Sequence, residues 1–382
     1  MMLVPLIFLM GIGVVMIGSA SMEHGARYLN NESYFLNRHL VYLLLSAIGG
    51  YVCFKVPMPL WLKLAPLLLL VAIVLLAVIL VPGVGLTNKG GTRWLPIGGF
   101  TLQVSEIAKF ALIMYLASYL VRQRDLVTTT FVGFLNPLIV ISVIVVLLLA
   151  EPDLGASVVL LAVSLGMLFL GGVKVMQFSL LMIASVASMT AMIFTEEYRR
   201  DRLFALMDPW SDRQGDGYQI IESLIAFGRG EWFGSGLGNG MQKQFYLPEA
   251  HNDFIFAVLS EELGFFGSVL VIVLFAFVLY RLVSIARSAE RMGEFFNAFF
   301  CYGVALLLFV QLVINVGVNV GLLPPTGLTL PFISYGGTSL LVTCCLLAVV
   351  FRVNQELVAL LGEQNERKGR VVNTTLSVRQ MR

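Results

Sequence analysis

Ten runs of about 20 mostly apolar residues recur along the chain, and each is long enough to cross a membrane as a helix. Of the 382 residues, 58% are hydrophobic and only 13% are charged, too few polar side chains to cover a soluble globule of this size. We therefore predict an all-α integral membrane protein. The expected spans are 3–22, 39–55, 62–81, 104–121, 131–149, 153–171, 175–194, 254–281, 296–322 and 331–355.

Lys and Arg are distributed unequally between alternate loops. With the N-terminus in the cytoplasm, fourteen of them lie inside, whereas the short outer loops hold only Arg27, Arg38, Lys89 and Arg93. Because cytoplasmic loops carry the excess of positive charge, we expect both termini inside and the long segment 195–253 outside. The first run lacks a basic start, so we expect a retained helix rather than a signal peptide. Residues 1–362 form one expected membrane domain, followed by a polar cytoplasmic tail over 363–382.

Several functional classes are excluded by composition and by missing motifs. A net charge of +2 spread over short loops offers no basic stripe for nucleic acid. All four cysteines fall inside apolar runs, where we expect core residues rather than disulfides or zinc ligands. The sequence has no phosphate-binding Gly-x-x-x-x-Gly-Lys-Ser/Thr loop and no Asp-x-Asp motif, so we expect no nucleotide and no cofactor that the sequence itself requires.

The outer segment 195–253 has an ordered pattern. Over 218–227, four apolar residues share one helical face, which predicts a helix lying flat on the outer leaflet. Gly228 and Gly230 are expected to end it. The glycines that follow, up to Gly240, fit either a backbone that approaches a ligand closely or a tight structural loop.

The segment ends in the run Phe245–Asp253, which places ionisable groups at the mouth of an apolar helix. Intramembrane ionisable residues are functional candidates, so we favour Asp253 as a catalytic carboxylate, with helix capping as the alternative. Ala257, Ser260 and Glu261 share its helical face. Glu261 lies about 12 Å along the helix from Asp253, too far for a carboxylate dyad.

Glu106 and Lys109 form a second polar cluster, three residues apart in the fourth run. An ammonium one turn inside the membrane needs such a partner, and we predict either a buried structural ion pair or an anion-binding lysine oriented by Glu106.

Amides and carboxylates near other helix ends are expected to be structural. Gln311, Asn315 and Asn319 recur every four residues, a pattern that usually joins helices. Glu151 and Asp153 flank Pro152, where they could cap the next helix or pair with a loop cation.

Together these motifs resemble the SEDS family (shape, elongation, division and sporulation) over nearly the whole chain, and the divisional branch more than the elongation branch. The matching segments are 91–94, 103–109, 151–156, 208–210, 217–219, 226–230, 245–253, 321–324 and 331–337. The sequence departs from the usual pattern at Val104, where Pro is common, and at Asn252, where Thr is common. A polar extension often precedes the first helix in the divisional branch and is missing here, as expected of a trimmed or short family member.

The resemblance implies a peptidoglycan glycosyltransferase that polymerises lipid II outside the bacterial cytoplasmic membrane, at the division site. It implies a class B penicillin-binding protein and other division proteins as partners. It also implies that Asp253 is the essential carboxylate.

We hypothesise that Asp253 is the general base and that outer cations, Arg213 among them, neutralise a departing polyprenyl pyrophosphate. A divalent cation such as Mg or Mn could assist, and no metal ligands are identified. A lipid II flippase and a non-catalytic division scaffold are the alternatives. Candidate substrate-binding residues are Arg93, Gln103, Glu106, Lys109, Gln219, Arg229, Lys243, Glu249, His251 and Ser334.

Overall fold

Each of the ten predicted spans overlaps one helix of the computed structural model, which describes residues 2–88, 91–195, 197–213, 215 and 217–380. Lys89 lies outside the described residues. The corresponding helices are α1 (Leu3–Leu29), α2 (Tyr34–Lys55), α3 (Met58–Ile79), α4 (Val104–Arg122), α6 (Phe131–Ala150), α7 (Leu154–Leu170), α8 (Val175–Thr195), α11 (Ile255–Arg291), α12 (Phe295–Asn319) and α13 (Gly337–Gln380).

Length and composition identify the chain as an integral membrane protein. Within the described residues, seven helices are long and apolar enough to span a membrane: α1, α3, α4, α6, α11, α12 and α13. α7 and the first part of α8 are shorter apolar helices. α2 carries Asn37, Arg38 and His39 near its start, which lowers its hydropathy. Helices suit a bilayer because their backbone groups are hydrogen-bonded internally.

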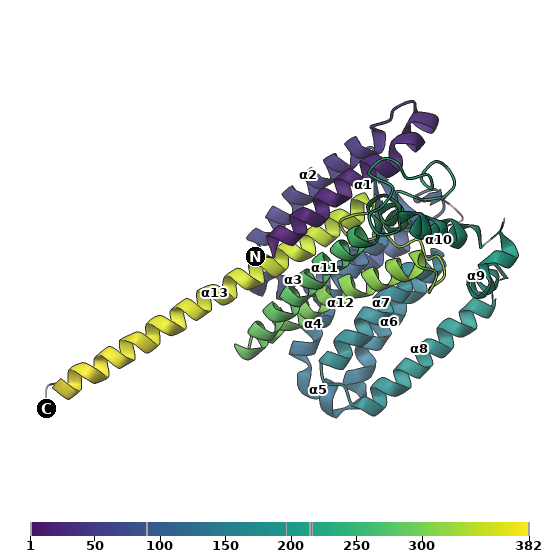
Figure 1. Ribbon diagram of the computed structural model, residues 1–382. Helices are drawn as coiled ribbons and strands as arrows, with labels where there is room; N and C mark the ends of the chain where they lie inside the picture. Colours follow the sequence, from purple (N-terminus) through teal and green to yellow (C-terminus); the bar gives the residue numbers. More distant parts are fainter. Residues whose placement is uncertain (1, 89–90, 196, 214, 216, 381–382) are drawn as a thin grey trace.

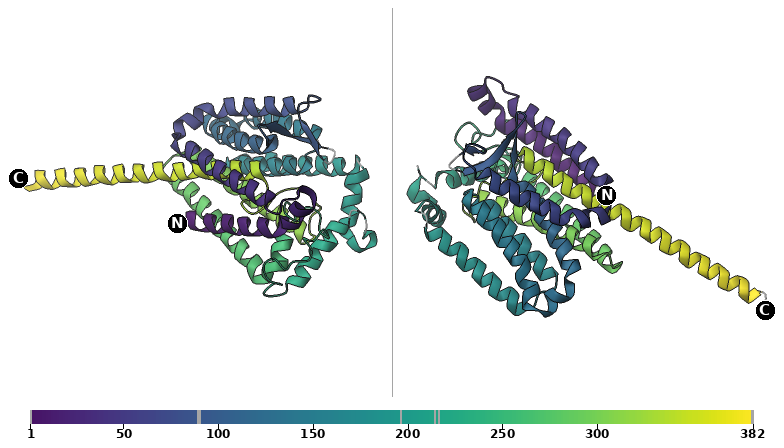
Figure 2. Two further views of the ribbon diagram at one scale, coloured as in Figure 1. Left: turned by 90° about the horizontal axis from the view of Figure 1, so that it is seen from above. Right: turned by 180° about the vertical axis from the view of Figure 1, so that it is seen from behind.

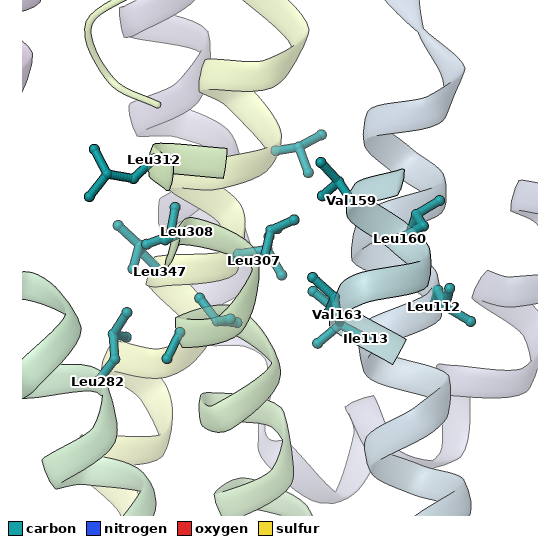
Figure 3. Packing of buried hydrophobic residues seen from close by; sticks show 14 of the residues in the cluster. Leu112, Ile113, Val159, Leu160, Val163, Leu282, Leu307, Leu308, Leu312 and Leu347 are labelled. Carbon is teal, nitrogen blue, oxygen red and sulfur yellow. The ribbon is translucent and has the colours of Figure 1, made fainter. Parts of the chain in front are cut away.

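The helices pack side by side, with the outer segment at one end of the bundle (Figure 1). The N-terminus and the C-terminal part of α13 lie toward the other end, and α13 continues as a helix beyond residue 363. α2 packs along α13, α3 along α4, and α11 along both α12 and α1. Leu112 of α4, Leu160 of α7 and Leu308 of α12 are among the fully buried side chains at the centre (Figure 3).

A small antiparallel sheet precedes α4, and the predicted all-α fold did not include it. It has the order β1 (Leu86–Asn88), β2 (Gly91–Ile97) and β3 (Phe100–Gln103). β1 and β3 have only three and four residues, too few for an alternating pattern to be read from the sequence. Thr338 ties the sheet to the start of α13, because its hydroxyl donates to the Thr101 carbonyl at 3.0 Å and accepts from the Gln103 N–H at 3.1 Å.

The outer segment contains α9 (Glu197–Met207), the 3₁₀ turn η1 (Pro209–Asp212) and α10 (Tyr218–Gly230). The predicted helix at 218–227 is confirmed, and it continues through Gly228 to Gly230. Its apolar face, which was expected to lie on the outer leaflet, packs instead on α11 and α12, where Ile220 is fully buried. Residues 231–253 form a series of turns and bends.

α11 is interrupted at Gly264, which has a φ of 70°. The turn after α10 fills this break, because the N–H groups of Ser235 and Gly236 donate to the carbonyls of Glu261 and Glu262 at 2.9 and 3.1 Å. In return, the Phe265 N–H donates to the Glu231 carbonyl at 2.9 Å. Non-helical backbone near a membrane is tolerated where protein satisfies it in this way.

Gly264→Ala should therefore destabilise the protein strongly. A Cβ at this position would lie 2.3 Å from the Gly234 nitrogen, and the backbone conformation, φ 70° and ψ −167°, is nearly restricted to glycine and costs other residues about 1–3 kcal/mol. The control is Gly228→Ala, where a Cβ meets nothing within 4 Å. Thermal unfolding in detergent, followed with a thiol-reactive dye on the free cysteines, should show a lower midpoint for Gly264→Ala only. Equal midpoints would contradict this account of the break.

Candidate active site

Asp253 lies two residues before α11, and its backbone is held by α12. Its carbonyl accepts hydrogen bonds from the Asn315 and Asn319 side-chain amides at 3.0 and 2.8 Å. The Asn319 side-chain oxygen accepts from the Ala257 N–H at 2.9 Å. These amides therefore join two helices as predicted, and they fix the backbone of Asp253 just before α11. Asp253 is half-buried. The N-cap residue of α11 is Phe254, the residue after Asp253. Catalysis and helix capping by Asp253 both stay predictions.

The residues just before Asp253 are held by the segment that leads into α13. The Ser334 hydroxyl donates to the Asn252 carbonyl at 2.6 Å and accepts from the Leu330 N–H at 2.7 Å. The Tyr335 N–H donates to the His251 carbonyl at 2.9 Å. Ser334, a predicted substrate-binding residue, is 4% exposed, and its hydroxyl orders the backbone next to the carboxylate.

His251 belongs to an aromatic cluster between the C-terminal end of α1 and the turn that leads to Asp253. Its ring centroid lies 5.4 Å from that of His24 and 4.8 Å from that of Phe35. Glu249 accepts a hydrogen bond from the Asn252 side-chain amide and has a positive φ of 57°. A non-glycine residue rarely adopts this conformation, so the turn is strained as well as packed.

The predicted pair in α4 is confirmed. The Lys109 ammonium donates to a Glu106 carboxylate oxygen at 2.7 Å, and the two side chains are 1% and 6% exposed. Lys109 is thus enclosed, and it could meet a substrate only if neighbouring side chains moved. Its anion-binding role stays a prediction. Gln103, at the start of the same helix, is half-buried and contributes its backbone N–H to Thr338.

Arg93 of β2 binds the turn between α6 and α7. Its guanidinium donates to the carbonyls of Glu151 and Pro152 and lies 3.9 Å from an Asp153 carboxylate oxygen. Asp153 caps α7 by accepting from the Ala156 N–H at 3.1 Å. Both predicted roles of this turn, capping and pairing with a loop cation, therefore occur at Asp153.

Glu151 is fully buried, and among the described residues neither of its carboxylate oxygens has a hydrogen-bond partner. Burial, and to a lesser extent the neighbouring Asp153, raises the pKa of Glu151 from 4.5 to about 8, against the opposing effect of Arg93. A buried carboxyl without a partner is most stable with its proton on.

The raised pKa of Glu151 makes stability depend on pH. The folded protein holds this proton up to about pH 8, whereas the unfolded chain releases it above 4.5, so the contribution is full below 4.5 and lost as pH rises through 8. The thermal midpoint of the wild type should therefore fall between about pH 5 and about pH 9. In Glu151→Gln, which cannot ionise, the fall should be smaller. An identical pH profile for the two proteins would show that Glu151 does not titrate in this way.

Arg229 and Lys243, both predicted to bind substrate, are paired with adjacent carboxylates of α11. Arg229 lies 3.0 Å from Glu261 and remains 43% exposed, whereas Lys243 lies 2.7 Å from Glu262 and is 6% exposed. Gln219 is half-buried in the first turn of α10. Sequence reasoning missed Glu262, although two adjacent glutamates inside an apolar run were a visible signal.

Among the residues that the structure describes, no three His, Cys, Asp or Glu side chains lie together as possible ligands of a metal ion.

Known proteins similar to this chain agree with the motifs. A family model described as cell cycle protein, carrying the names FtsW, RodA and SpoVE, matches residues 1–358. The probable peptidoglycan glycosyltransferase FtsW of Saccharophagus degradans is 48% identical over 349 residues, covering 91% of this chain and 90% of that protein. The protein of the same description from Hahella chejuensis is 48% identical over 358 residues, covering 94% and 90%.

Solved structures share the fold. A chain from a peptidoglycan synthase complex, described by its coordination of polymerization and crosslinking, superposes with a TM-score of 0.76 at 28% identity, covering 93% of this chain and 97% of its own length. The rod shape determining protein RodA of Thermus thermophilus superposes with a TM-score of 0.69 at 26% identity, covering 93% and 96%. The chain therefore belongs to the FtsW, RodA and SpoVE family of cell cycle proteins, the SEDS family that its motifs resemble.

Proposed function

We propose that this protein is a peptidoglycan glycosyltransferase that polymerises lipid II at the outer face of the bacterial cytoplasmic membrane during cell division. The observation that carries the proposal is the half-buried residue Asp253, whose backbone carbonyl is held just before α11 by two amides of α12. The similarity to FtsW proteins named as glycosyltransferases, over nine-tenths of the chain, supports the same reaction class.

Asp253 acts as the general base in this proposal. It takes the proton from the 4-hydroxyl of the acceptor sugar while that oxygen attacks C1 of the donor sugar. The bond between C1 and the pyrophosphate oxygen breaks, and polyprenyl pyrophosphate leaves with the electron pair. Glycoside hydrolases need a second carboxylic acid to protonate the leaving oxygen. Pyrophosphate is a stable anion and needs positive charge instead, so one carboxylate is sufficient.

Arg93 and Arg229 are the cations that the geometry favours for the leaving group. Their side chains are 25% and 43% exposed, so each can reach a ligand without losing its pairing with Asp153 or Glu261. The Arg213 guanidinium lies over the Trp210 ring at 4.9 Å, also in the outer segment. Lys109 would join them once its enclosure opens. Guanidinium groups suit this task because they bind phosphate oxygens through two parallel hydrogen bonds.

A class B penicillin-binding protein is the proposed partner, since one structural relative is part of a complex that coordinates polymerization with crosslinking. Other membrane proteins of the division machinery and the surrounding lipid complete the expected surroundings.

The test is incubation of the purified protein with lipid II, with and without the penicillin-binding protein, followed by separation of the products on a gel. Glycan chains made by wild type and absent with Asp253→Asn would support the proposal. Movement of lipid II across vesicle membranes without chain formation would indicate a flippase. If neither polymerisation nor transport of lipid II is observed with the partner present, the result would indicate a non-catalytic scaffold.

A further inference from the structure

Two adjacent carboxylates of α11 hold the turn that leads toward Asp253. One Glu262 carboxylate oxygen accepts from the Lys243 ammonium at 2.7 Å, and the other accepts from the Gly238 N–H at 3.1 Å. The Glu261 carboxylate accepts from the N–H groups of Met241 and Gln242 at 2.9 and 3.0 Å. Both carboxylates are fully buried, so these bonds are not weakened by competing water.

Gly240 shows how closely this turn fits between the two carboxylates. A Cβ at residue 240 would lie 3.0 Å from an oxygen of Glu261 and 3.0 Å from an oxygen of Glu262. The close approach therefore favours glycine, which explains one member of the glycine series that the sequence left open between a ligand and a tight loop.

Ser19 of α1 joins this cluster from a helix far away in the sequence. Its hydroxyl lies 2.7 and 2.8 Å from the two Glu262 oxygens, to which it donates, and it accepts from the Lys243 ammonium at 2.7 Å. Lys243 also donates to the Gly238 carbonyl at 2.8 Å, so its three N–H groups are all used. No N–H of Lys243 is left for a phosphate, which gives this lysine a different role from the predicted substrate contact.

The ion pair between Lys243 and Glu262 joins two points of the chain on either side of Asp253, so residues 243–262 form a closed ring that contains Asp253. From Lys243 the chain runs ten residues to Asp253, enters α11 and returns to Glu262 nine residues later, a separation of 19 residues between the paired ions. Asp253 thus lies midway round the ring from the ion pair. Its carbonyl is held by α12, and Ser19 is the link from the ion pair to α1.

We propose that Ser19, Lys243 and Glu262 are positioning residues for Asp253, and that the Ser19 hydroxyl ties the catalytic turn to α1. The inference rests on the proposed function, in which Asp253 must meet an acceptor hydroxyl at hydrogen-bond distance. A buried ion pair contributes little net stability, but it imposes one geometry on the groups around it. Displacement of a catalytic group by about 1 Å can reduce a rate about a hundredfold, so a small loosening is measurable.

Ser19→Ala is the test, because it removes only the link to α1 and leaves the ion pair intact. Ser21→Ala is the matched control: Ser21 is buried on the same helix and donates to its own helix at the Ile17 carbonyl at 2.6 Å. We expect Ser19→Ala to lower kcat about tenfold or more with unchanged KM for lipid II, and to lower the thermal midpoint only slightly, since one N–H of Lys243 loses its acceptor. Ser19→Thr, which keeps the hydroxyl, should restore the rate.

Hydrogen exchange supplies a readout that does not depend on activity. In Ser19→Ala, the amides of Gly238, Met241 and Gln242 should exchange about tenfold faster than in wild type, while amides in the centre of α12 keep their rates. A kcat and an exchange pattern equal to those of Ser21→Ala would overturn the proposal. Loss of thermal stability with faster exchange throughout the protein would also overturn it, since the hydroxyl would then serve general packing.

Failure of the proposed function would look different. A wild-type protein that makes no glycan, alone or with its partner, refutes the glycosyltransferase and removes the kcat comparison. Hydrogen exchange then tests the link between Ser19 and the turn on its own. Faster exchange in Ser19→Ala that is confined to residues 238–253 supports the link, and unchanged exchange overturns it.

Discussion

Asp253→Asn is expected to reduce glycan polymerisation by about 10²- to 10⁴-fold, the usual contribution of a general base. Asn has nearly the same shape and keeps the backbone carbonyl that Asn315 and Asn319 hold, so the fold should be unchanged. What is lost is the ability to accept the proton of the acceptor hydroxyl. The measurement is the initial rate of polymerisation by purified protein, with a binding assay for lipid II beside it.

Lipid II affinity should remain close to that of wild type, because binding depends on the lipid chain and on outer cations rather than on this carboxylate. Asn252→Asp/Asp253→Asn, which moves the carboxylate by one residue, is a matched control for charge and should be equally inactive. An Asn variant with full polymerisation would refute the role of Asp253.

Removal of Lys109 is expected to have the second largest effect. Lys109→Ala leaves Glu106 as a buried, unpaired carboxylate, and breaking such a pair typically costs about 3–5 kcal/mol of stability. If the ammonium also stabilises the departing pyrophosphate, turnover falls as well, by about 10²- to 10³-fold for the loss of one such group. A lower turnover of Lys109→Ala alone therefore does not distinguish lost protein stability from lost stabilisation of the pyrophosphate.

The double variant Glu106→Gln/Lys109→Met separates these causes, since it removes both charges and leaves none unpaired. Its thermal midpoint should return toward that of wild type, because replacing both members of a buried pair is often neutral. Our account expects turnover to stay low. Recovery of turnover together with stability would show that the pair serves structure alone.

The sequence predicted those parts of the fold that depend on local pattern. Apolar runs located the ten helices, and the facial pattern of 218–227 located α10, because a helix repeats its contacts every three to four residues. The Glu106 and Lys109 pair could be predicted for the same reason. The sheet at 86–103 was missed, although Gly98 and Gly99 join β2 to β3 as a two-residue hairpin turn, a signal that the sequence carries.

Only part of the candidate site could be predicted from the sequence, for a related reason. Asp253 stood out because a carboxylate is costly at the mouth of an apolar helix. Lys243 was expected to face a ligand, and the structure instead surrounds it with Ser19, Gly238 and Glu262. Those contacts join residues up to 224 positions apart, and no periodicity within one segment reports them. Pairing across such distances is decided by tertiary packing.

The central claim, that the residue 253 carboxylate works from the outer side of the membrane, can be tested directly by labelling. The four native cysteines are free, so they are first replaced by alanine, and Asp253→Cys is introduced with Arg287→Cys at the other end of α11 as control. Intact spheroplasts are then treated with a membrane-impermeant maleimide. Our account predicts labelling at 253 and none at 287 until the membrane is permeabilised; labelling at 253 only after permeabilisation would contradict it.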